Sequence, residues 1–272
     1  MIKNIPKFLE HLYEEIRKQT DYAIIGLSGG ADSTLVAILC KNALGQGNVE
    51  GIHMPYGDID KEKFNARSIR LAIHLNIQQR YVPITTIADA IIKTTRLEAM
   101  LKTSQTNEGN ARARARMCML YSIAHAMSDV WTDKRVRVMN TCNLSESYIG
   151  YETKFGDGAG DIAPIGELFK SEVYQLLDYF KEQGVLTEEL IDRVPSAGLF
   201  SGQTDEGELG FSYNEMERAV KFYQGVELGC YGVELMSTQE TQKIYDFVKQ
   251  RHEANKHKSE VPKVIPLRQF VE

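Results

Sequence analysis

The strongest constraint on the fold is a glycine-containing turn near the start of the chain, with the sequence Gly-Leu-Ser-Gly-Gly-Ala-Asp-Ser at residues 26–33. Residues 22–27 form an apolar run with the length of a buried strand, and residues 34–44 have the apolar spacing of a helix. Gly29 and Gly30 let the backbone bend and a ligand come close. Because the N–H groups at a helix start are unpaired and the helix dipole favours negative charge, this turn is suited to a phosphate or pyrophosphate group.

One residue of the turn indicates a cation as well. Asp32 places a carboxylate beside the expected phosphate, and the two groups repel each other unless a cation lies between them, so we expect Mg²⁺ on Asp32. The turn lacks the Gly-Lys-Ser/Thr end of a Walker A loop, and it is not the dinucleotide-binding GxGxxG loop. A strand-to-helix turn without a ligand is the simpler alternative, and the number of specified positions argues against it.

The composition of the chain limits its fold and location. A length of 272 residues with 43% hydrophobic content suffices for a globular core, and we expect one domain over residues 1–272. The net charge of −5 argues against bulk nucleic-acid binding. The cysteines are far apart and lack metal-ligand spacing, which is typical of reduced cytoplasmic thiols. No apolar run has the length of a membrane span, and the charged N-terminus does not resemble a signal peptide. We therefore expect a cytoplasmic protein without nucleic-acid or membrane partners.

Strands and helices alternate along the first half of the chain. Besides the strand at residues 22–27, the pattern predicts strands at residues 49–56, 79–84 and 135–142 with helices between them. This alternation predicts an α/β fold with a doubly wound parallel sheet of the Rossmann-like kind and helices on both faces. Ligands of such sheets bind beyond the carboxyl ends of the strands, and the common 3-2-1-4-5 order places the fourth strand beside the first.

Further charged residues are expected near the turn. Glu146 follows the fourth strand, so it can reach the cation on Asp32, although a carboxylate that only stabilises a helix start is the common alternative. Lys170 begins a predicted helix, where its charge opposes the helix dipole, and this indicates a compensating anion. The polar residues 102–110 are predicted to be a mobile loop, and residues 201–210 are predicted to be a lid that orders on binding.

Two segments in the middle of the chain are candidates for a second ligand. Residues 109–117 read Gly-Asn-Ala-Arg-Ala-Arg-Ala-Arg-Met and lead into a helix, on which Arg114 points away from the face shared by Arg112 and Arg116. Such clusters are usually solvated, but an arginine turned out of the stripe suits an anionic ligand. The glycine-rich residues 150–170 suit a loop shaped around a ligand, although most such loops are only flexible.

Taken together, these segments resemble the ammonia-dependent NAD⁺ synthetases of the N-type ATP pyrophosphatase superfamily. The resemblance runs from residue 26 to about residue 262. Besides the turn and the arginine segment, it rests on Asn-Thr-Cys-Asn-Leu-Ser-Glu, Thr-Lys-Phe-Gly-Asp-Gly-Ala-Gly-Asp, Pro-Ser-Ala-Gly-Leu, Gly-Gln-Thr-Asp-Glu-Gly-Glu-Leu-Gly-Phe-Ser-Tyr and His-Lys-Ser-Glu-Val-Pro. It implies the adenine nucleotide α-hydrolase type of fold. It also implies a ligase that amidates deamido-NAD⁺ with ammonia through an adenylated carboxylate, with release of AMP and pyrophosphate, in the last step of NAD⁺ biosynthesis.

The resemblance implies roles for individual residues. Asp32 and Glu146 would hold Mg²⁺, and these two residues with Lys170 would form the catalytic set. The implied ATP-binding residues are Gly26, Leu27, Ser28, Gly29, Gly30, Ala31, Asp32, Ser33, Thr141, Lys170 and Ser196. The implied residues for deamido-NAD⁺ are Arg114, Lys154, Asp161, His257 and Lys258. A homodimer with the dinucleotide near the subunit interface is also implied.

The chain departs from the family pattern at two positions. Gly198 stands where the family usually has Asp, which puts the region of Ser196 in question, and Asn140 stands where Gly is usual. A fused glutaminase domain is not expected, because only residues 1–21 precede the first strand, so free ammonia or a separate donor protein would serve.

Two alternatives share the turn. A tRNA-modifying ATP pyrophosphatase usually needs cysteine pairs and a basic surface, and neither is visible in the sequence. A non-catalytic nucleotide-binding module would have no reason to keep Asp32, Glu146 and Lys170 together.

Overall fold

The computed structural model describes residues 1–57, 66–191, 204–227 and 239–267. Within these ranges, the chain forms a parallel sheet with the strand order β3-β2-β1-β4. This confirms the predicted parallel sheet and the place of the fourth strand beside the first. A parallel bridge between Met139 and Ile162 adds a short pairing at the end of β4. The strands are β1 (Tyr22–Gly26), β2 (Val49–His53), β3 (Gln78–Tyr81) and β4 (Val136–Met139).

The central strand β1 is buried on both faces, as expected for a parallel sheet between helical layers. Ala23 and Ile25 face one apolar cluster, and Tyr22 and Ile24 face another, because successive side chains of a strand point to opposite sides. All four side chains are fully buried. This alternation determines which side chains of β1 face each of the two helical layers.

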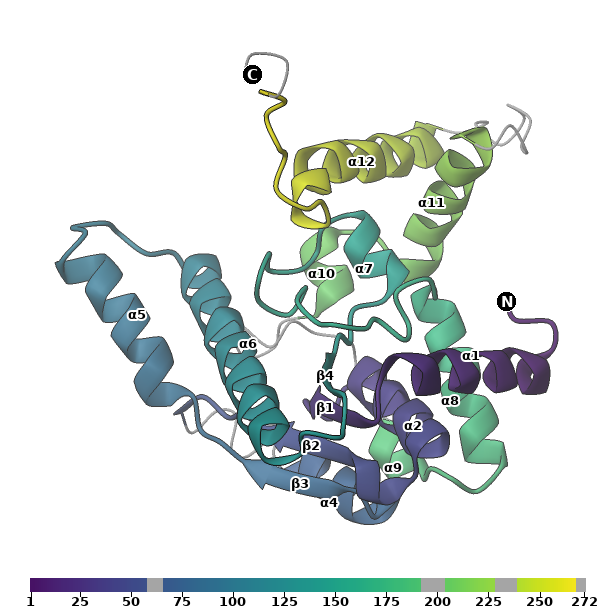
Figure 1. Cartoon of the computed structure of the whole chain (residues 1–272). Helices are drawn as coiled ribbons and strands as arrows, with labels where there is room; N and C mark the ends of the chain where they lie inside the picture. The colour runs from purple at the N-terminus through teal and green to yellow at the C-terminus, as the bar shows by residue number, and fades with distance from the viewer. Residues whose placement is uncertain (58–65, 192–203, 228–238, 268–272) are drawn as a thin grey trace.

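Helices cover both faces of the sheet, which confirms the predicted architecture (Figure 1). On one side, α2 packs against β1, β2, α1 and α8. This explains why α2 carries buried residues on almost every side of the helix. The first side carries α1 (Ile5–Gln19), α2 (Ala31–Leu44), η1 (Gln46–Asn48), α4 (Ala66–Leu75), α8 (Lys170–Glu182) and α9 (Glu188–Ile191). The second side carries α5 (Thr85–Leu97) and α6 (Gln105–Val130).

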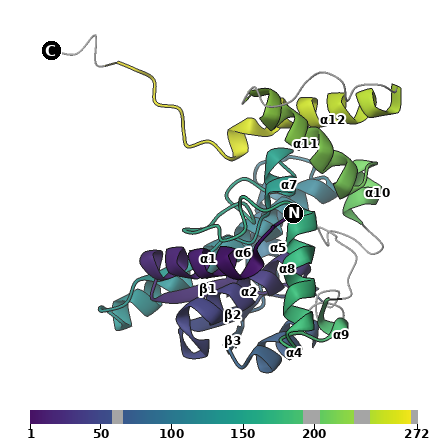
Figure 2. The same cartoon turned by 90° about the vertical axis from the view of Figure 1, so that its right-hand side faces the viewer.

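A separate group of helices packs around an apolar cluster of its own, with Ile149, Met216 and Val248 fully buried within it. This group lies on the side of the sheet toward which β4 leads (Figure 1). It consists of α7 (Leu144–Tyr148), α10 (Asp205–Leu209), α11 (Tyr213–Glu227), α12 (Gln239–Asn255) and η4 (Lys256–Lys258). Residues 259–267 then run away from the body of the molecule (Figure 2). The single domain over residues 1–272 stays a prediction.

Two polar segments differ from expectation. Residues 105–110, predicted to be part of a mobile loop, form the start of α6, because Ser104 Oγ caps the helix by accepting a hydrogen bond from the Asn107 N–H at 3.1 Å. The predicted lid falls partly outside the described residues, and its described end is the short helix α10. Within the described ranges, no helix is both long and apolar enough to cross a membrane.

Candidate active site

The predicted phosphate turn joins β1 to α2, and its shape requires glycine at one position. Gly29 has a φ of +73°, a conformation that side-chain-bearing residues rarely adopt. A Cβ atom there would also lie 3.1 Å from the backbone nitrogen of Ser68. The narrow turn therefore depends on the missing side chain.

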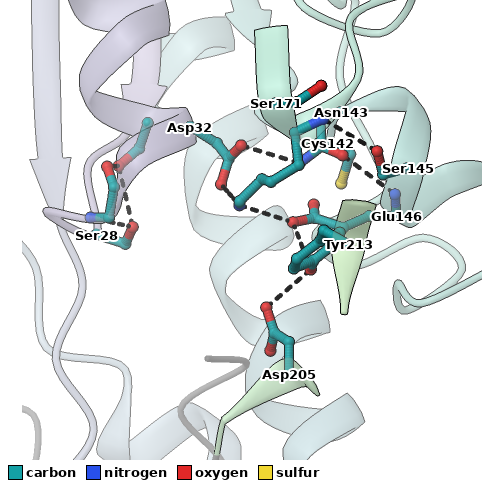
Figure 3. A network of polar contacts seen from close by, with 12 residues as sticks. Ser28, Asp32, Cys142, Asn143, Ser145, Glu146, Ser171, Asp205 and Tyr213 are labelled. Carbon is teal, nitrogen blue, oxygen red and sulfur yellow. Dashed lines mark hydrogen bonds and ion pairs between the residues drawn. The ribbon is translucent and has the colours of Figure 1, made fainter. Parts of the chain in front are cut away.

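Two hydroxyl groups hold the turn together. Ser28 Oγ lies 3.0 Å from Ser33 Oγ and accepts a hydrogen bond from the Gly30 N–H at 3.2 Å (Figure 3). Ser33 Oγ donates to the Gly30 carbonyl oxygen at 3.2 Å. The predicted serines thus shape the turn from within, next to the start of α2.

The side chains of Asp32, Glu146 and Lys170 meet at one point. Lys170 Nζ lies 2.5 Å from Asp32 Oδ2 and 3.0 Å from Glu146 Oε1. Only 4% of the lysine side chain is exposed, against 18% and 15% for the two carboxylates. The sequence predicts an anion that compensates the charge of Lys170. In this structure, the two carboxylates of Asp32 and Glu146 supply that negative charge.

The charges of this group shift one another. Burial alone would lower the pKa of Lys170, but the carboxylates of Asp32 and Glu146 raise it above its usual value. Burial and the nearby Asp32 raise the pKa of Glu146, and the Lys170 ammonium opposes this rise. The site therefore favours one positive charge held between two acidic groups.

Asn143 orients the carboxylate of Asp32 and was not predicted as a site residue. Its Nδ2 donates to Asp32 Oδ1 at 2.9 Å, and its Oδ1 accepts from the Glu146 N–H at 3.1 Å, which caps α7. The side chain is fully buried. A local signal existed, because Asn followed three residues later by Glu has the spacing of a helix cap.

Tyr213 approaches the same site from α11. Its hydroxyl donates to Asp205 Oδ2 at 2.9 Å and lies 3.4 Å from Glu146 Oε1. The ring centroid lies 5.5 Å from Lys170 Nζ. Burial, and next the carboxylates of Glu146 and Asp205, raise the pKa of this hydroxyl, so it remains protonated. No sequence spacing links Tyr213 to the turn, because their contact arises from tertiary packing.

A cavity of about 510 Å³ opens on this group. Glu146 and nearly all predicted ATP-binding residues line the cavity, whereas Gly29 does not and Ser196 lies outside the described residues. The predicted ATP-binding residues that line the cavity are Gly26, Leu27, Ser28, Gly30, Ala31, Asp32, Ser33, Thr141 and Lys170.

The predicted deamido-NAD⁺ residues are placed differently. Lys258 lines the cavity and its Nζ donates to the carbonyl oxygens of Gly150 and Glu152 at 2.7 and 2.9 Å. Arg114 is exposed, and its Nε donates to the Lys154 carbonyl oxygen at 3.3 Å.

The remaining three predicted residues for deamido-NAD⁺, Lys154, Asp161 and His257, also lie apart from the cavity wall. Lys154 Nζ contacts the carbonyl oxygen of His257, so Arg114, Lys154 and His257 form a chain of neighbours. Asp161 is separate from them, because its Oδ2 accepts from the Val138 N–H at 2.8 Å beside β4.

The departure at Asn140 has a structural role. Its Nδ2 donates to the carbonyl oxygens of Asp157 and Ala159 at 3.1 and 3.2 Å. Its Oδ1 accepts from the Cys142 N–H at 2.8 Å. Asn140 thus holds the glycine-rich loop against the end of β4, while Gly198 lies outside the described residues.

Known proteins match this chain over nearly its full length. The family model described as NAD synthase matches residues 1–262. The NH(3)-dependent NAD(+) synthetase of Fusobacterium nucleatum is 32% identical over 96% of this chain and 95% of that protein. The protein of the same name from Methanosarcina acetivorans is 34% identical over 96% of this chain and 98% of its own length.

Solved structures agree with the sequence relatives. The NMN synthetase of Francisella tularensis has a TM-score of 0.76 and 28% identity over 97% of this chain and 100% of that chain. The NH3-dependent NAD synthetase of Campylobacter jejuni, solved with a nitrate ion, has a TM-score of 0.71 and 30% identity over 96% of this chain and 99% of that chain. The resemblance seen in the sequence is thereby confirmed, and the chain belongs to the NAD synthase family.

Proposed function

We propose that this chain is an ammonia-dependent NAD⁺ synthetase, which uses ATP to amidate deamido-NAD⁺ and releases AMP and pyrophosphate. Membership of the NAD synthase family supports this activity. The observation that carries the proposal is the meeting of Asp32, Glu146 and Lys170 beside the turn, on the wall of one cavity.

The reaction needs activation of the nicotinate carboxylate, because its oxygens are poor leaving groups. A carboxylate oxygen attacks the α-phosphorus of ATP, forms a C–O–P link and displaces pyrophosphate. Ammonia then adds to the activated carbonyl carbon, AMP leaves with the bridging oxygen, and the nitrogen loses a proton to give the amide. The turn amides and the Lys170 ammonium would stabilise charge on the departing pyrophosphate, and positioning would provide the remaining catalysis.

The residues present fit Mg²⁺. Asp32 and Glu146 offer carboxylate oxygens, and the Lys170 ammonium between them is a stand-in cation. The described residues contain no cluster of three or more His, Cys, Asp or Glu side chains suited to a metal. Two carboxylates match Mg²⁺, which takes its other ligands from phosphate and water. When bound, the ion would neutralise charge that develops on the phosphates.

The proposed binding residues for deamido-NAD⁺ remain Arg114, Lys154, Asp161, His257 and Lys258. The position of Lys258 on the cavity wall supports its role, since a lysine beside the nucleotide cavity suits an anionic group of the substrate. For ATP, the proposed set keeps the turn, Thr141, Lys170 and Ser196.

We also propose a cytoplasmic homodimer. Exposed apolar side chains lie at the end of α5 and just after it, at Leu97, Met100 and Leu101, with 60%, 87% and 60% of their surface accessible, and a second copy of the chain would cover them. Sedimentation analysis at micromolar concentration should give a dimer, and a monomer with full activity would contradict it.

A second candidate function is NMN synthesis from nicotinate mononucleotide, because the structural neighbour from Francisella tularensis is named NMN synthetase. Both substrates carry the same nicotinate carboxylate, so the chemistry is shared. The ratio of kcat/KM for the dinucleotide and the mononucleotide distinguishes the two functions.

The proposed function is tested by pyrophosphate release with ATP, Mg²⁺, ammonium and deamido-NAD⁺, with each component omitted in turn. Release that requires deamido-NAD⁺ and yields NAD⁺ is expected. Release with tRNA alone, or ATP binding without turnover, would favour one of the two alternatives that share the turn.

A further inference from the structure

The carboxylate pair of the proposed metal site already holds a cation, which belongs to the chain itself. Lys170 Nζ contacts Asp32 Oδ2 and Glu146 Oε1. In the described part of the chain, no other cationic side chain forms an ion pair with either carboxylate. The pair therefore depends on this ammonium for its neutralisation.

The backbone N–H of Lys170 is held by a buried chain of hydrogen bonds. Its N–H donates to Ser145 Oγ at 3.0 Å, and Ser145 Oγ in turn donates to Glu217 Oε1 at 2.9 Å. The residue also lines the cavity. Because a lysine side chain is a flexible four-carbon stem, a change in its side-chain torsion angles moves Nζ without movement of α8.

The two oxygens of Asp32 are not equivalent. Oδ1 accepts the hydrogen bond from Asn143 Nδ2, whereas Oδ2 contacts the Lys170 ammonium, which also contacts Glu146 Oε1. A divalent ion bound through Asp32 Oδ2 and Glu146 Oε1 would replace the ammonium at both oxygens. With the ammonium in place, the ion would also meet a like charge at short range.

We propose that Lys170 is the exchangeable counter-ion of the metal site, so that a divalent cation and the Lys170 ammonium compete for Asp32 and Glu146. Entry of the cation frees the ammonium for the phosphate oxygens in the cavity. The inference rests on the proposed function, which places the divalent ion on these two residues. It gives Lys170 two successive partners, namely the carboxylates before the metal binds and the phosphates afterwards.

The test measures Mn²⁺ binding to the full chain without nucleotide, by electron paramagnetic resonance of the free ion. Lys170→Met should bind Mn²⁺ about tenfold or more tightly than the wild type, because a competing positive charge is removed. Lys170→Arg keeps the charge and should bind no more tightly than the wild type. The matched control is Lys221→Met, whose Nζ lies over the Phe169 ring with a centroid distance of 4.4 Å, and it should leave the Mn²⁺ affinity unchanged.

A further variant separates this inference from the proposed function. Asp32→Asn should abolish Mn²⁺ binding at this site. Unchanged binding in Asp32→Asn would overturn the proposed metal site and with it the inference. Lost binding in Asp32→Asn together with unchanged or weaker binding in Lys170→Met would overturn the inference alone.

A crystal structure of the wild type with Mn²⁺ provides the decision if Lys170→Met does not fold, as judged by circular dichroism. We expect anomalous density between Asp32 and Glu146, with Lys170 Nζ beyond hydrogen-bond distance of both. An ion elsewhere, or an ammonium that still contacts both carboxylates, would overturn the proposal.

Discussion

The proposed nucleotide-binding residues and the proposed substrate-binding residues lie on different kinds of elements, and we call these two groups the nucleotide end and the substrate end. At the nucleotide end, the turn, Thr141 and Lys170 lie at strand ends and helix starts that the buried sheet holds in place. At the substrate end, Arg114 lies exposed on α6, while Lys154 and His257 lie in a loop and in η4. The nucleotide end converges on the cavity within one chain, whereas of the proposed substrate residues only Lys258 among those described lines it.

The two ends also differ in the partners that hold their side chains in position. Side chains at the nucleotide end are fixed by buried partners, as Asn143 fixes Asp32. Arg114 and Lys154 bond instead to backbone carbonyl oxygens of neighbouring segments. We therefore expect mutations at the nucleotide end to affect chemistry and mutations at the substrate end to affect substrate affinity.

The largest effect is expected for Asp32→Ala. Loss of the carboxylate removes the proposed metal ligand and leaves the Lys170 charge without one partner, so kcat/KM should fall by about 100-fold or more. The coupled assay with deamido-NAD⁺ measures it. The control Asp178→Ala removes an exposed carboxylate from α8 and should keep the wild-type rate. A loss of only a few fold would contradict the metal role.

A smaller effect, confined to one substrate, is expected for Lys258→Met. Loss of a charged hydrogen-bond donor should raise the KM for deamido-NAD⁺ about tenfold, with the KM for ATP unchanged. Lys249→Met, on the exposed side of α12, is the control. An equal rise in both KM values would show that the two ends do not separate as described.

The free energy of unfolding should fall more for a variant at the nucleotide end than for a variant at the substrate end. Asn143→Ala removes the cap of α7 and the partner of Asp32, and should lower the free energy of unfolding by about 2 kcal/mol. Thr153→Val removes the single 2.8 Å hydrogen bond to Asn110 Oδ1 at the substrate end, and should cost about 1 kcal/mol. Urea denaturation of both variants measures these values, and a larger loss in Thr153→Val than in Asn143→Ala would show that the nucleotide end is not the more firmly held one.

The smallest change concerns thiol reactivity. Burial, with nearby carboxylates, raises the pKa of Cys142 beneath the nucleotide end, and burial raises the pKa of Cys40 to about 12. A raised thiol pKa reduces the thiolate, the form that reacts. At pH 8, iodoacetamide should therefore label the exposed Cys118 well before Cys40 and Cys142, as read by mass spectrometry. Rapid labelling of Cys142 would show that the nucleotide end opens.

The sequence predicted the strands and the turn because their signals are local, and it predicted the sheet order from the 3-2-1-4-5 order common to doubly wound sheets. Apolar periodicity marks β1 and α2, and the glycine and serine positions of the turn mark a bend at a helix start. Asn143 had a local signal in its spacing to Glu146, which the interpretation of Glu146 as a metal ligand passed over. Tyr213 had none, because it lies 67 residues from Glu146 in sequence and reaches it only through packing of α11.

The substrate end was harder to predict for a physical reason. The spacing of arginines in residues 109–117 states which face of a helix each one occupies, but not which segment packs beside it. Arg114 and Lys154 are 40 residues apart and meet through a backbone carbonyl oxygen, which carries no sequence signal. The roles assigned there stay predictions, as does that of Ser196.

Transfer of a carboxylate oxygen to AMP distinguishes adenylation of deamido-NAD⁺ from other ways of activating it. Deamido-NAD⁺ labelled with ¹⁸O in both carboxylate oxygens is converted with ATP and ammonium, and the AMP is examined by mass spectrometry. If the carboxylate attacks the α-phosphorus and pyrophosphate leaves, one ¹⁸O appears in the AMP phosphate and the other remains in the amide carbonyl. Unlabelled AMP, or labelled inorganic phosphate formed together with ADP, would contradict the account.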